Sequence, residues 1–151
     1  MVIQVDSREK DRAIKKIIEE FDRQGVKHPV SKLMVGDYMN YDNPRLVIDR
    51  KQNLSEVCSN VCQGHERFRR ELLRAQEYGI QLVILVEHGK GIKSLADVIW
   101  WRNPRGDKSM QGDVLSKIME TQERKYGVRW EFCEKRQTGK RIIEILSGGC
   151  L

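Results

Sequence analysis

The sequence from residue 36 to residue 51 reads GDYMNYDNPRLVIDRK, and the rest of the chain is organised around it. Residues 40–44 are turn formers and their neighbours suit a pleated strand, so this stretch predicts a β-hairpin. Side chains alternate between the two faces of a strand, which places Val47, Asp49 and Lys51 together on one face. Asp37 begins the partner strand, and we expect it to reach the same place.

Two acids and a lysine that converge at a strand end suit metal-dependent cleavage of phosphodiester bonds. Carboxylate oxygens are hard ligands of the kind that hold Mg²⁺. A lysine beside them orients the attacking water or offsets the charge that develops on the phosphate. The hairpin therefore predicts a hydrolytic metal site built from Asp37, Asp49 and Lys51.

The bulk composition narrows the class of protein. A chain of 151 residues is typical of one domain that buries a core without disulfides. Its net charge of +6 gives modest support to a polyanionic partner. There is no signal segment and the longest apolar run is only residues 82–86, so we expect a cytoplasmic protein that spans no membrane. The cysteines form no CxxC pair, which favours reduced thiols over a zinc site; they are Cys58, Cys62, Cys133 and Cys150.

Strand-like and helix-like patterns alternate along the chain. Besides the hairpin, the strands are expected at residues 2–6, 26–33, 81–87 and 128–133. The helices are expected at residues 10–24, 54–61, 65–78, 94–101, 114–125 and 138–146. Pro29 favours an edge position for the strand at residues 26–33. Ser94 is the expected N-terminal cap of the helix at residues 94–101. This order predicts an α/β fold with a mixed central sheet and helices on both sides.

A second copy of the acid and lysine pattern occurs at Gly112-Asp113 and Glu123-Arg124-Lys125. The residues between them follow a helical period, so Asp113 and Lys125 would lie about 18 Å apart along one helix. No metal ion bridges that distance. We therefore interpret the second copy as an exposed helix and keep the hairpin as the candidate site.

Several motifs together resemble the nuclease domain of XPF-type structure-specific endonucleases. They are Val5-Asp6-Ser7-Arg8-Glu9, Gly36-Asp37-Tyr38, Val47-Ile48-Asp49-Arg50-Lys51, Arg67-Phe68 and the hydrophobic strand from Leu82 to Glu87. The resemblance implies a restriction-endonuclease-like fold and a nuclease that uses Mg²⁺ or Mn²⁺. It also implies that the substrate is branched DNA, such as a flap or fork, of which one strand is cut.

The resemblance also assigns roles to residues. Asp37 and Asp49 are similar to the metal ligands of the family and Lys51 to its catalytic lysine. The supporting members of the site are Asp6, Glu9 and Arg50. Arg50 points away from Lys51 in the expected strand, so it is more suited to hold a carboxylate or tie the strand to the helix behind. The candidate contacts to DNA phosphates are Arg67, Arg70 and Arg8.

The sequence departs from the family pattern in two ways. The family has a glutamate where this chain has Asp49, and an aspartate where it has Ser55. Glu56 either compensates for Ser55 or caps a helix that begins after Asn53, in a capping-box pattern. The chain also ends at residue 151 without room for a helix-hairpin-helix domain. The expectation is a single nuclease domain over residues 1–151, similar to small bacterial and phage relatives.

Two other functions remain open from the sequence. The chain could be a non-catalytic DNA-binding or partner subunit, since Ser55 removes a charge from the site. It could also be a resolvase of four-way junctions that acts as a symmetric homodimer. The pair Trp100-Trp101 is either part of the core, a self-association surface or a stacking surface for unpaired bases.

Overall fold

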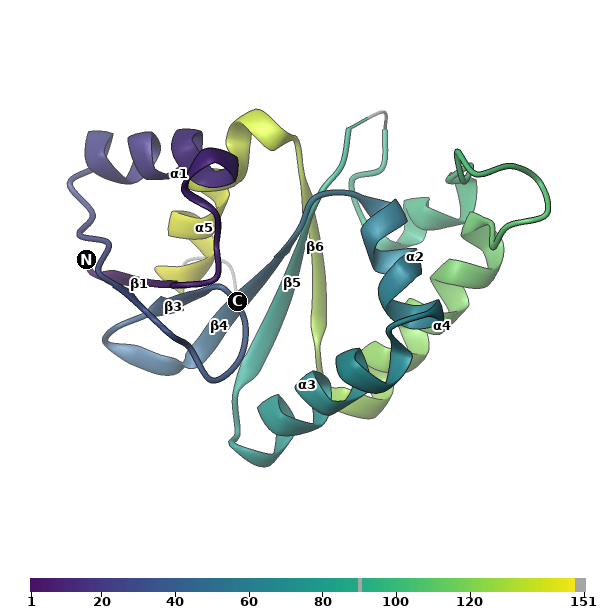
Figure 1. Ribbon diagram of the computed structural model, residues 1–151, viewed down its shortest axis with the longest axis horizontal. Helices are drawn as coiled ribbons and strands as arrows, with labels where there is room; N and C mark the ends of the chain where they lie inside the picture. The colour runs from purple at the N-terminus through teal and green to yellow at the C-terminus, as the bar shows by residue number, and fades with distance from the viewer. Residues whose placement is uncertain (90, 149–151) are drawn as a thin grey trace.

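A computed structural model shows one six-stranded mixed sheet, and it describes residues 1–89 and 91–148. The strands lie in the order β2-β1-β3-β4-β5-β6 (Figure 1). Their bounds are β1 Ile3–Asp6, β2 Val30–Ser31, β3 Tyr38–Asn40, β4 Asn43–Lys51, β5 Gln81–Glu87 and β6 Arg129–Cys133. The predicted hairpin is β3 and β4, which pair antiparallel in the middle of the sheet. The strand after Pro29 is β2, at the sheet edge as expected.

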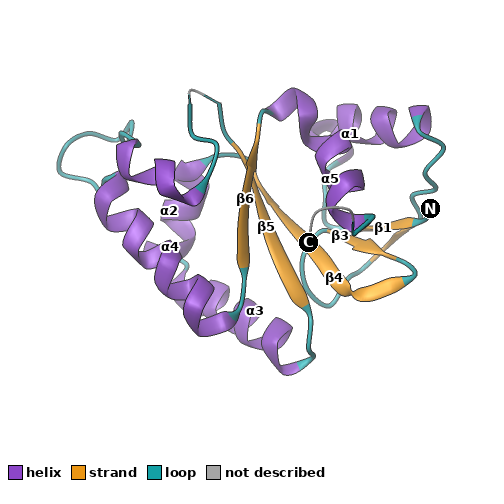
Figure 2. Cartoon of the chain, turned by 180° about the vertical axis from the view of Figure 1, so that it is seen from behind, coloured by secondary structure: helices purple, strands orange, loops and turns teal. Residues whose placement is uncertain are grey.

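Helices cover both faces of the sheet, as Figure 2 shows. On one face lie α1 and α5, and on the other lie α2, α3, α4 and the 3₁₀ helix η1. Their bounds are α1 Asp11–Arg23, α2 Leu54–Cys62, α3 His65–Glu77, η1 Leu95–Trp100, α4 Gly112–Tyr126, η2 Lys135–Gln137 and α5 Thr138–Leu146. The predicted α/β architecture is therefore confirmed.

Alternation along the central strand β4 divides the interior into two cores. Leu46 and Ile48 join the core beneath α1 and α5, whereas Val47 joins the core beneath α2, α3 and α4. The same alternation continues to the polar end of the strand, so Asp49 and Lys51 lie on the α3 side and Arg50 on the α1 side. The burial of two apolar faces fixes which way each polar residue points.

One edge of the sheet collects the candidate residues. β4, β5 and β6 are parallel to one another, and β3 is antiparallel to both β1 and β4. The carboxyl ends of β1, β4 and β5 therefore meet the amino end of β3 at the same edge. Asp6, Asp49 and Glu87 come from those carboxyl ends, and Asp37 precedes β3.

Some local predictions were wrong. Ser94 makes no capping hydrogen bond with its side chain, and its helix is the short 3₁₀ turn η1. Only Val30 and Ser31 form a strand in the segment predicted at residues 26–33. Lys27 makes an isolated parallel bridge to Val2, and the ladder is interrupted at Pro29, which has no N–H to donate. The stretch from Gly112 to Lys125 lies within α4, which confirms that the second acid and lysine pattern is helical. Cys58, Cys62 and Cys133 are free thiols, while Cys150 lies outside the described residues.

Candidate active site

Gly36 gives Asp37 its position. Its φ of +72° lies in the left-handed region, and a Cβ here would lie 2.5 Å from Cγ1 of Val47 and 2.9 Å from the carbonyl oxygen of Ile48. Only glycine allows the chain to pass this close to β4. The side chain of Asp37 is then held against β4, because the Arg50 N–H donates to Oδ2 of Asp37 at 2.7 Å. Burial and the adjacent Asp49 carboxylate raise the pKa of Asp37 well above its usual value.

Asp49 and Lys51 lie on the same face of β4, as the alternation predicted. Nζ of Lys51 lies 3.2 Å from Oδ2 of Asp49, and both side chains are buried. The ammonium also lies 5.2 Å from the centre of the Phe68 ring on α3. Burial opposes the charge on Lys51, but attraction by Asp49, Glu56 and Glu71 outweighs it, so the pKa of Lys51 is raised and the lysine stays charged.

Glu71 on α3 is a site residue that the sequence analysis missed. It lines the same cavity as Asp37 and Asp49, and its carboxylate accepts a hydrogen bond from the backbone N–H of Gly36. Burial, and then repulsion by Asp49, raise the pKa of Glu71 to about 7. A signal was present, because Glu71 follows the buried Phe68 by three residues and precedes the buried Leu72 by one. The four arginines of this helix made its polar residues look like an ordinary solvated face, so Glu71 was not singled out.

Arginines surround the mouth of this cavity, whose volume is about 340 Å³. Its basic lining residues are Arg8, Arg67, Arg70 and Arg74, and its acidic ones are Asp37, Asp49 and Glu71. The structure thus brings all three predicted phosphate contacts to the cavity that holds both predicted metal ligands. Arg74 was not among the predicted contacts, and its guanidinium donates to the carbonyl oxygen of Met34 at 3.2 Å.

Lys51 contacts the lining residue Asp49 but does not itself line this cavity, and neither do the other predicted members, Asp6, Glu9 and Arg50. Asp6 is 1% exposed, accepts from the Leu33 N–H at 2.7 Å and pairs with Arg8 at 2.7 Å. It therefore fixes Arg8 at the cavity mouth. Arg50 occupies the opposite face of the sheet, where it pairs with Glu9 at 3.0 Å. The expectation that Arg50 holds a carboxylate is confirmed.

Glu87, at the end of β5, is a second residue that the sequence analysis missed. Oε1 accepts from Arg50 at 2.7 Å and Oε2 accepts from the hydroxyl of Thr138, which begins α5, at 2.6 Å. All three side chains are buried. Glu87 thus joins β4, β5 and α5 behind the site. The sequence did contain a signal for Glu87, because this acid directly follows the apolar run of residues 82–86.

The carboxylates suit a divalent metal ion in number and chemistry. Within the described residues, no three His, Cys, Asp or Glu side chains form a ready-made metal cluster. Mg²⁺, however, is commonly held by one or two carboxylates together with water and substrate phosphate. Oδ2 of Asp49 is buried and accepts no well-aligned hydrogen bond from any described residue, despite its proximity to Lys51. Asp37 and Asp49 would be the ligands of such an ion.

Ser55 and Glu56 lie on α2, outside the cavity that holds the acids. Asn53 accepts from the Glu56 N–H at 2.8 Å, and the Glu56 carboxylate accepts from the Gln52 N–H at 2.7 Å. The capping role of Glu56 is therefore confirmed. From this position the negative charge of Glu56 still helps to raise the pKa of Lys51.

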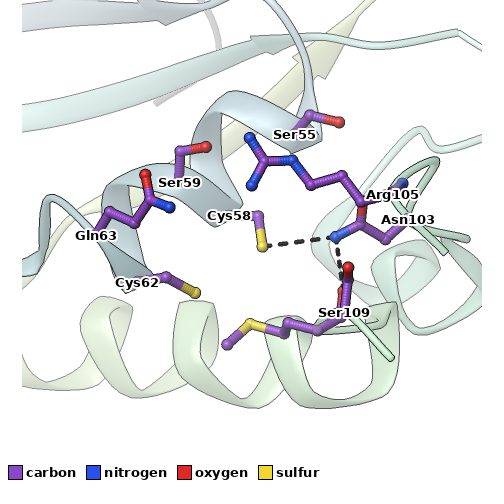
Figure 3. Close-up of a pocket in the computed structure, with 9 residues that line it drawn as sticks. Ser55, Cys58, Ser59, Cys62, Gln63, Asn103, Arg105 and Ser109 are labelled. Carbon is purple, nitrogen blue, oxygen red and sulfur yellow. Dashed lines mark hydrogen bonds between the residues drawn. The ribbon is translucent and has the colours of Figure 1, made fainter. Parts of the chain in front are cut away.

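A separate cavity of about 110 Å³ lies between α2 and the loop that follows η1 (Figure 3). Cys58 and Cys62 from α2 face Asn103 and Ser109 from the loop across it. The Asn103 amide donates to the Cys58 sulfur at 3.8 Å, which joins the loop to the helix. No acid lines this cavity, so it does not contribute to the metal chemistry.

Comparisons with known proteins agree with this fold. A solved structure of XPF from Aeropyrum pernix matches with a TM-score of 0.72 and 23% identity, over 100% of this chain and 67% of that chain. A second, of XPF from Aeropyrum pernix in complex with DNA, matches with a TM-score of 0.68 and 21% identity, over 97% of this chain and 63% of that chain. The chain thus spans about two thirds of the XPF chains, and the restriction-endonuclease-like fold is confirmed.

The sequence profile of the ERCC4 domain matches residues 5–146, which is nearly the whole chain. The chain belongs to the ERCC4 domain family, and the predicted likeness to XPF-type nucleases is confirmed. A comparison with curated protein sequences gave no match. Among the helices in residues 1–89 and 91–148, none combines the length and apolarity that a membrane span requires.

Proposed function

We propose that this chain is a divalent-metal-dependent DNA endonuclease that cuts one strand of branched DNA, such as a flap or fork. The observation that carries the proposal is that Asp37 and Asp49 line one cavity together with four arginines, while Lys51 contacts Asp49 at 3.2 Å. Acids at the base suit a metal ion, and arginines at the rim suit a phosphate backbone. Family membership supports the same reaction class.

Each residue of the site has a defined task in this proposal. Asp37 and Asp49 hold Mg²⁺ or Mn²⁺, which when bound polarises the phosphate and makes a nearby water more acidic. Lys51 remains protonated and offsets negative charge on the phosphate as the bond breaks. Arg8, Arg67 and Arg70 bind the DNA phosphates on either side of the cut. Glu9 and Arg50 keep β4 in register behind the metal ligands.

A cleavage panel tests the proposal directly. Single-stranded, duplex, flap, fork and four-way substrates are incubated with Mg²⁺, Mn²⁺ or EDTA. We expect single-strand cuts near the branch with either metal and none with EDTA. Asp37→Ala and Lys51→Ala should abolish cleavage while the circular dichroism spectrum stays unchanged. Cleavage at the parent rate by either variant would show that the site is assigned wrongly.

The exposed acid and lysine of α4 provide matched controls. Asp113→Ala and Lys125→Ala repeat the same chemical changes on α4, where both side chains are exposed. We expect both variants to cut at the parent rate.

If the parent itself cuts no substrate yet binds DNA, the alternative of a non-catalytic subunit holds. Paired symmetric nicks in the four-way substrate alone would instead indicate a junction resolvase.

Calorimetry separates catalysis from metal binding. Titration of the parent with Mg²⁺ in the absence of DNA should give a saturable heat change, and Asp49→Asn should reduce or remove it because one ligand is lost. Equal heats for the two proteins would contradict Asp49 as a ligand.

A further inference from the structure

A cavity of about 440 Å³ lies at the start of α2 and shares no lining residue with the candidate active site. One wall is the start of α2, where Asn53 and Ser55 follow Lys51 by two and four residues. The other walls come from the segment after β5 and from the end of η1, with His88, Trp100 and Arg102 among the lining residues. The cavity therefore opens at the same edge of the sheet as Asp49 and Lys51.

Trp100 is an exposed aromatic residue that lines this cavity. Its side chain is 76% exposed, whereas the other two tryptophans, Trp101 and Trp130, are 7% and 5% exposed. The indole of Trp130 also donates to the carbonyl oxygen of Met119, so it is committed to the core. A large aromatic ring that the fold leaves in solvent at a cavity rim is suited to bind a flat apolar surface.

The backbone beneath Trp100 is held firmly. The Trp101 N–H donates to the carbonyl oxygen of Val98 at 2.9 Å, and the Gly112 N–H donates to that of Trp101 at 3.1 Å. η1 lies so close to α4 here that a Cβ on Gly112 would come within 2.0 Å of the Val98 carbonyl oxygen. The exposed ring thus stands on a fixed base and loses little freedom when it stacks.

The loop that carries Arg102 is also anchored, as Figure 3 shows around Asn103. The buried Asn103 amide donates to the carbonyl oxygen of Met110 at 3.0 Å, and the Asn103 N–H donates to the Gln111 side chain at 2.9 Å. Arg102 precedes this anchor, is exposed, and forms no ion pair with any side chain in residues 1–89 and 91–148. A cation and an aromatic ring are therefore presented together.

We propose that this cavity binds an unpaired nucleotide of DNA, with its base stacked on Trp100 and its phosphate beside Arg102. Aromatic rings paired with cations are the usual means by which proteins bind single strands without regard to sequence. The α2 wall of the cavity begins two residues after Lys51, at the same edge of the sheet as Asp49, so a strand bound at the candidate active site can extend toward it. The inference rests on the proposed nuclease function and deepens it, because branched DNA supplies unpaired bases beside a duplex.

Binding measured without cleavage tests the inference. A fluorescein-labelled 15-nucleotide oligothymidine and a blunt duplex of equal length are titrated with protein in EDTA, and anisotropy is recorded. Trp100→Ala should weaken single-strand binding by about 5-fold to 150-fold, the range that loss of one stacked base gives. Trp100→Phe should restore most of the affinity. Tyr41→Ala, an equally drastic change of an aromatic residue 62% exposed at the far end of β4, should leave affinity unchanged.

Intrinsic fluorescence provides a second readout. Trp100 is the one exposed tryptophan of three, so stacking by a base should quench the solvent-exposed emission of the parent. Trp100→Phe should show no such quenching although it still binds the oligonucleotide. Quenching that persists in Trp100→Phe would mean that DNA binds elsewhere.

Three further results would overturn the inference. One is equal single-strand affinity of the parent and Trp100→Ala, and another is an equal loss for the blunt duplex. The third is a parent that sediments as a dimer while Trp100→Ala sediments as a monomer, which would make Trp100 an interface between copies. These binding results stand apart from the nuclease proposal, since Asp49→Asn should still bind the oligonucleotide, and loss of cleavage in Asp37→Ala does not depend on Trp100.

Discussion

The Arg50 guanidinium lies 2.7 Å from the Glu87 carboxylate on the face of the sheet opposite Lys51. A second nitrogen of the same guanidinium lies 3.0 Å from Glu9, so one arginine compensates two carboxylates. All three side chains are at most 7% exposed. Neighbouring residues of β4 therefore perform different tasks: Lys51 contacts the candidate metal ligand Asp49, and Arg50 holds the structure behind it.

Arg50→Met should destabilise the protein strongly. Removal of one partner leaves two buried carboxylates without compensation, which typically costs about 3–5 kcal/mol. Urea unfolding followed by circular dichroism measures the change. Arg136→Met is the control, because Arg136 is 77% exposed in its pair with Glu134, and such pairs are worth at most about 1 kcal/mol. Equal losses in the two variants would contradict the structural role of Arg50.

Asp37→Asn should stabilise the protein in EDTA and remove its response to metal. Burial and the adjacent Asp49 carboxylate oppose the ionisation of Asp37 and raise its pKa, whereas an asparagine carries no charge and its oxygen still accepts the Arg50 N–H. The melting temperature without metal should therefore rise by a few degrees. Millimolar Mg²⁺ should raise the melting temperature of the parent, because a ligand that binds only the folded state stabilises it, but should not change that of Asp37→Asn. A matching rise in both proteins would place the metal elsewhere.

Asp6 should make stability depend on pH in the acid range. Burial opposes its ionisation, but hydrogen bonds from Arg8 and from the Leu33 N–H outweigh this and lower the pKa of Asp6 below its ordinary value of 3.8. The folded state then binds fewer protons than the unfolded state, so this stability is present above pH 3.8 and is lost as the pH falls through the pKa of the folded state.

The variant Asp6→Asn isolates this contribution. At pH 7 it should be less stable than the parent by about 1–3 kcal/mol, because charge-assisted hydrogen bonds are lost. As the pH falls below about 4, the usual range for an aspartate, the gap between parent and variant should narrow. Unfolding by urea at a series of pH values measures this difference in the free energy of unfolding between the parent and Asp6→Asn. A gap that stays constant to pH 2 would show that the charge of Asp6 is not responsible.

Gly112→Ala should destabilise the contact between η1 and α4. The added Cβ would lie 2.0 Å from the Val98 carbonyl oxygen and 2.8 Å from that of Trp101, so the backbone must shift, and overpacking of this kind costs about 1–3 kcal/mol. Gly89→Ala is the matched control, because no atom lies within 4 Å of its added Cβ. Thermal unfolding compares the two, and a stable Gly112→Ala would contradict the tight packing on which the fixed position of Trp100 depends.

Most of the fold could be predicted from residue patterns. The hairpin follows from a turn cluster between strand-like residues, and its two-residue period already placed Asp49 with Lys51 and apart from Arg50. α1 and α5 follow from apolar residues at helical spacing. Ser94 was misassigned as a cap because a cap depends on one hydrogen bond, whose geometry the sequence pattern does not specify.

The candidate site was only partly predictable. Asp37, Asp49 and Lys51 were found because they are close in sequence and belong to one hairpin. Glu71 and Glu87 were missed because their partners lie 20 and 37 residues away, at Lys51 and Arg50. Nothing in a local pattern distinguishes a buried acid with a distant partner from an acid on a solvated helix face.

The sequence by itself determined the hairpin, the alternation of its faces and the acid and lysine set at its end, because these follow from the local geometry of the chain. The tertiary structure alone decided which charges share a cavity. It turned Glu71 toward Asp49, placed Arg8 at the cavity mouth through Asp6, and left Trp100 in solvent at a cavity that begins at the start of α2. The physical reason is that the burial of two apolar faces sets how the helices pack on the sheet, and that packing fixes every distance between charges on different elements.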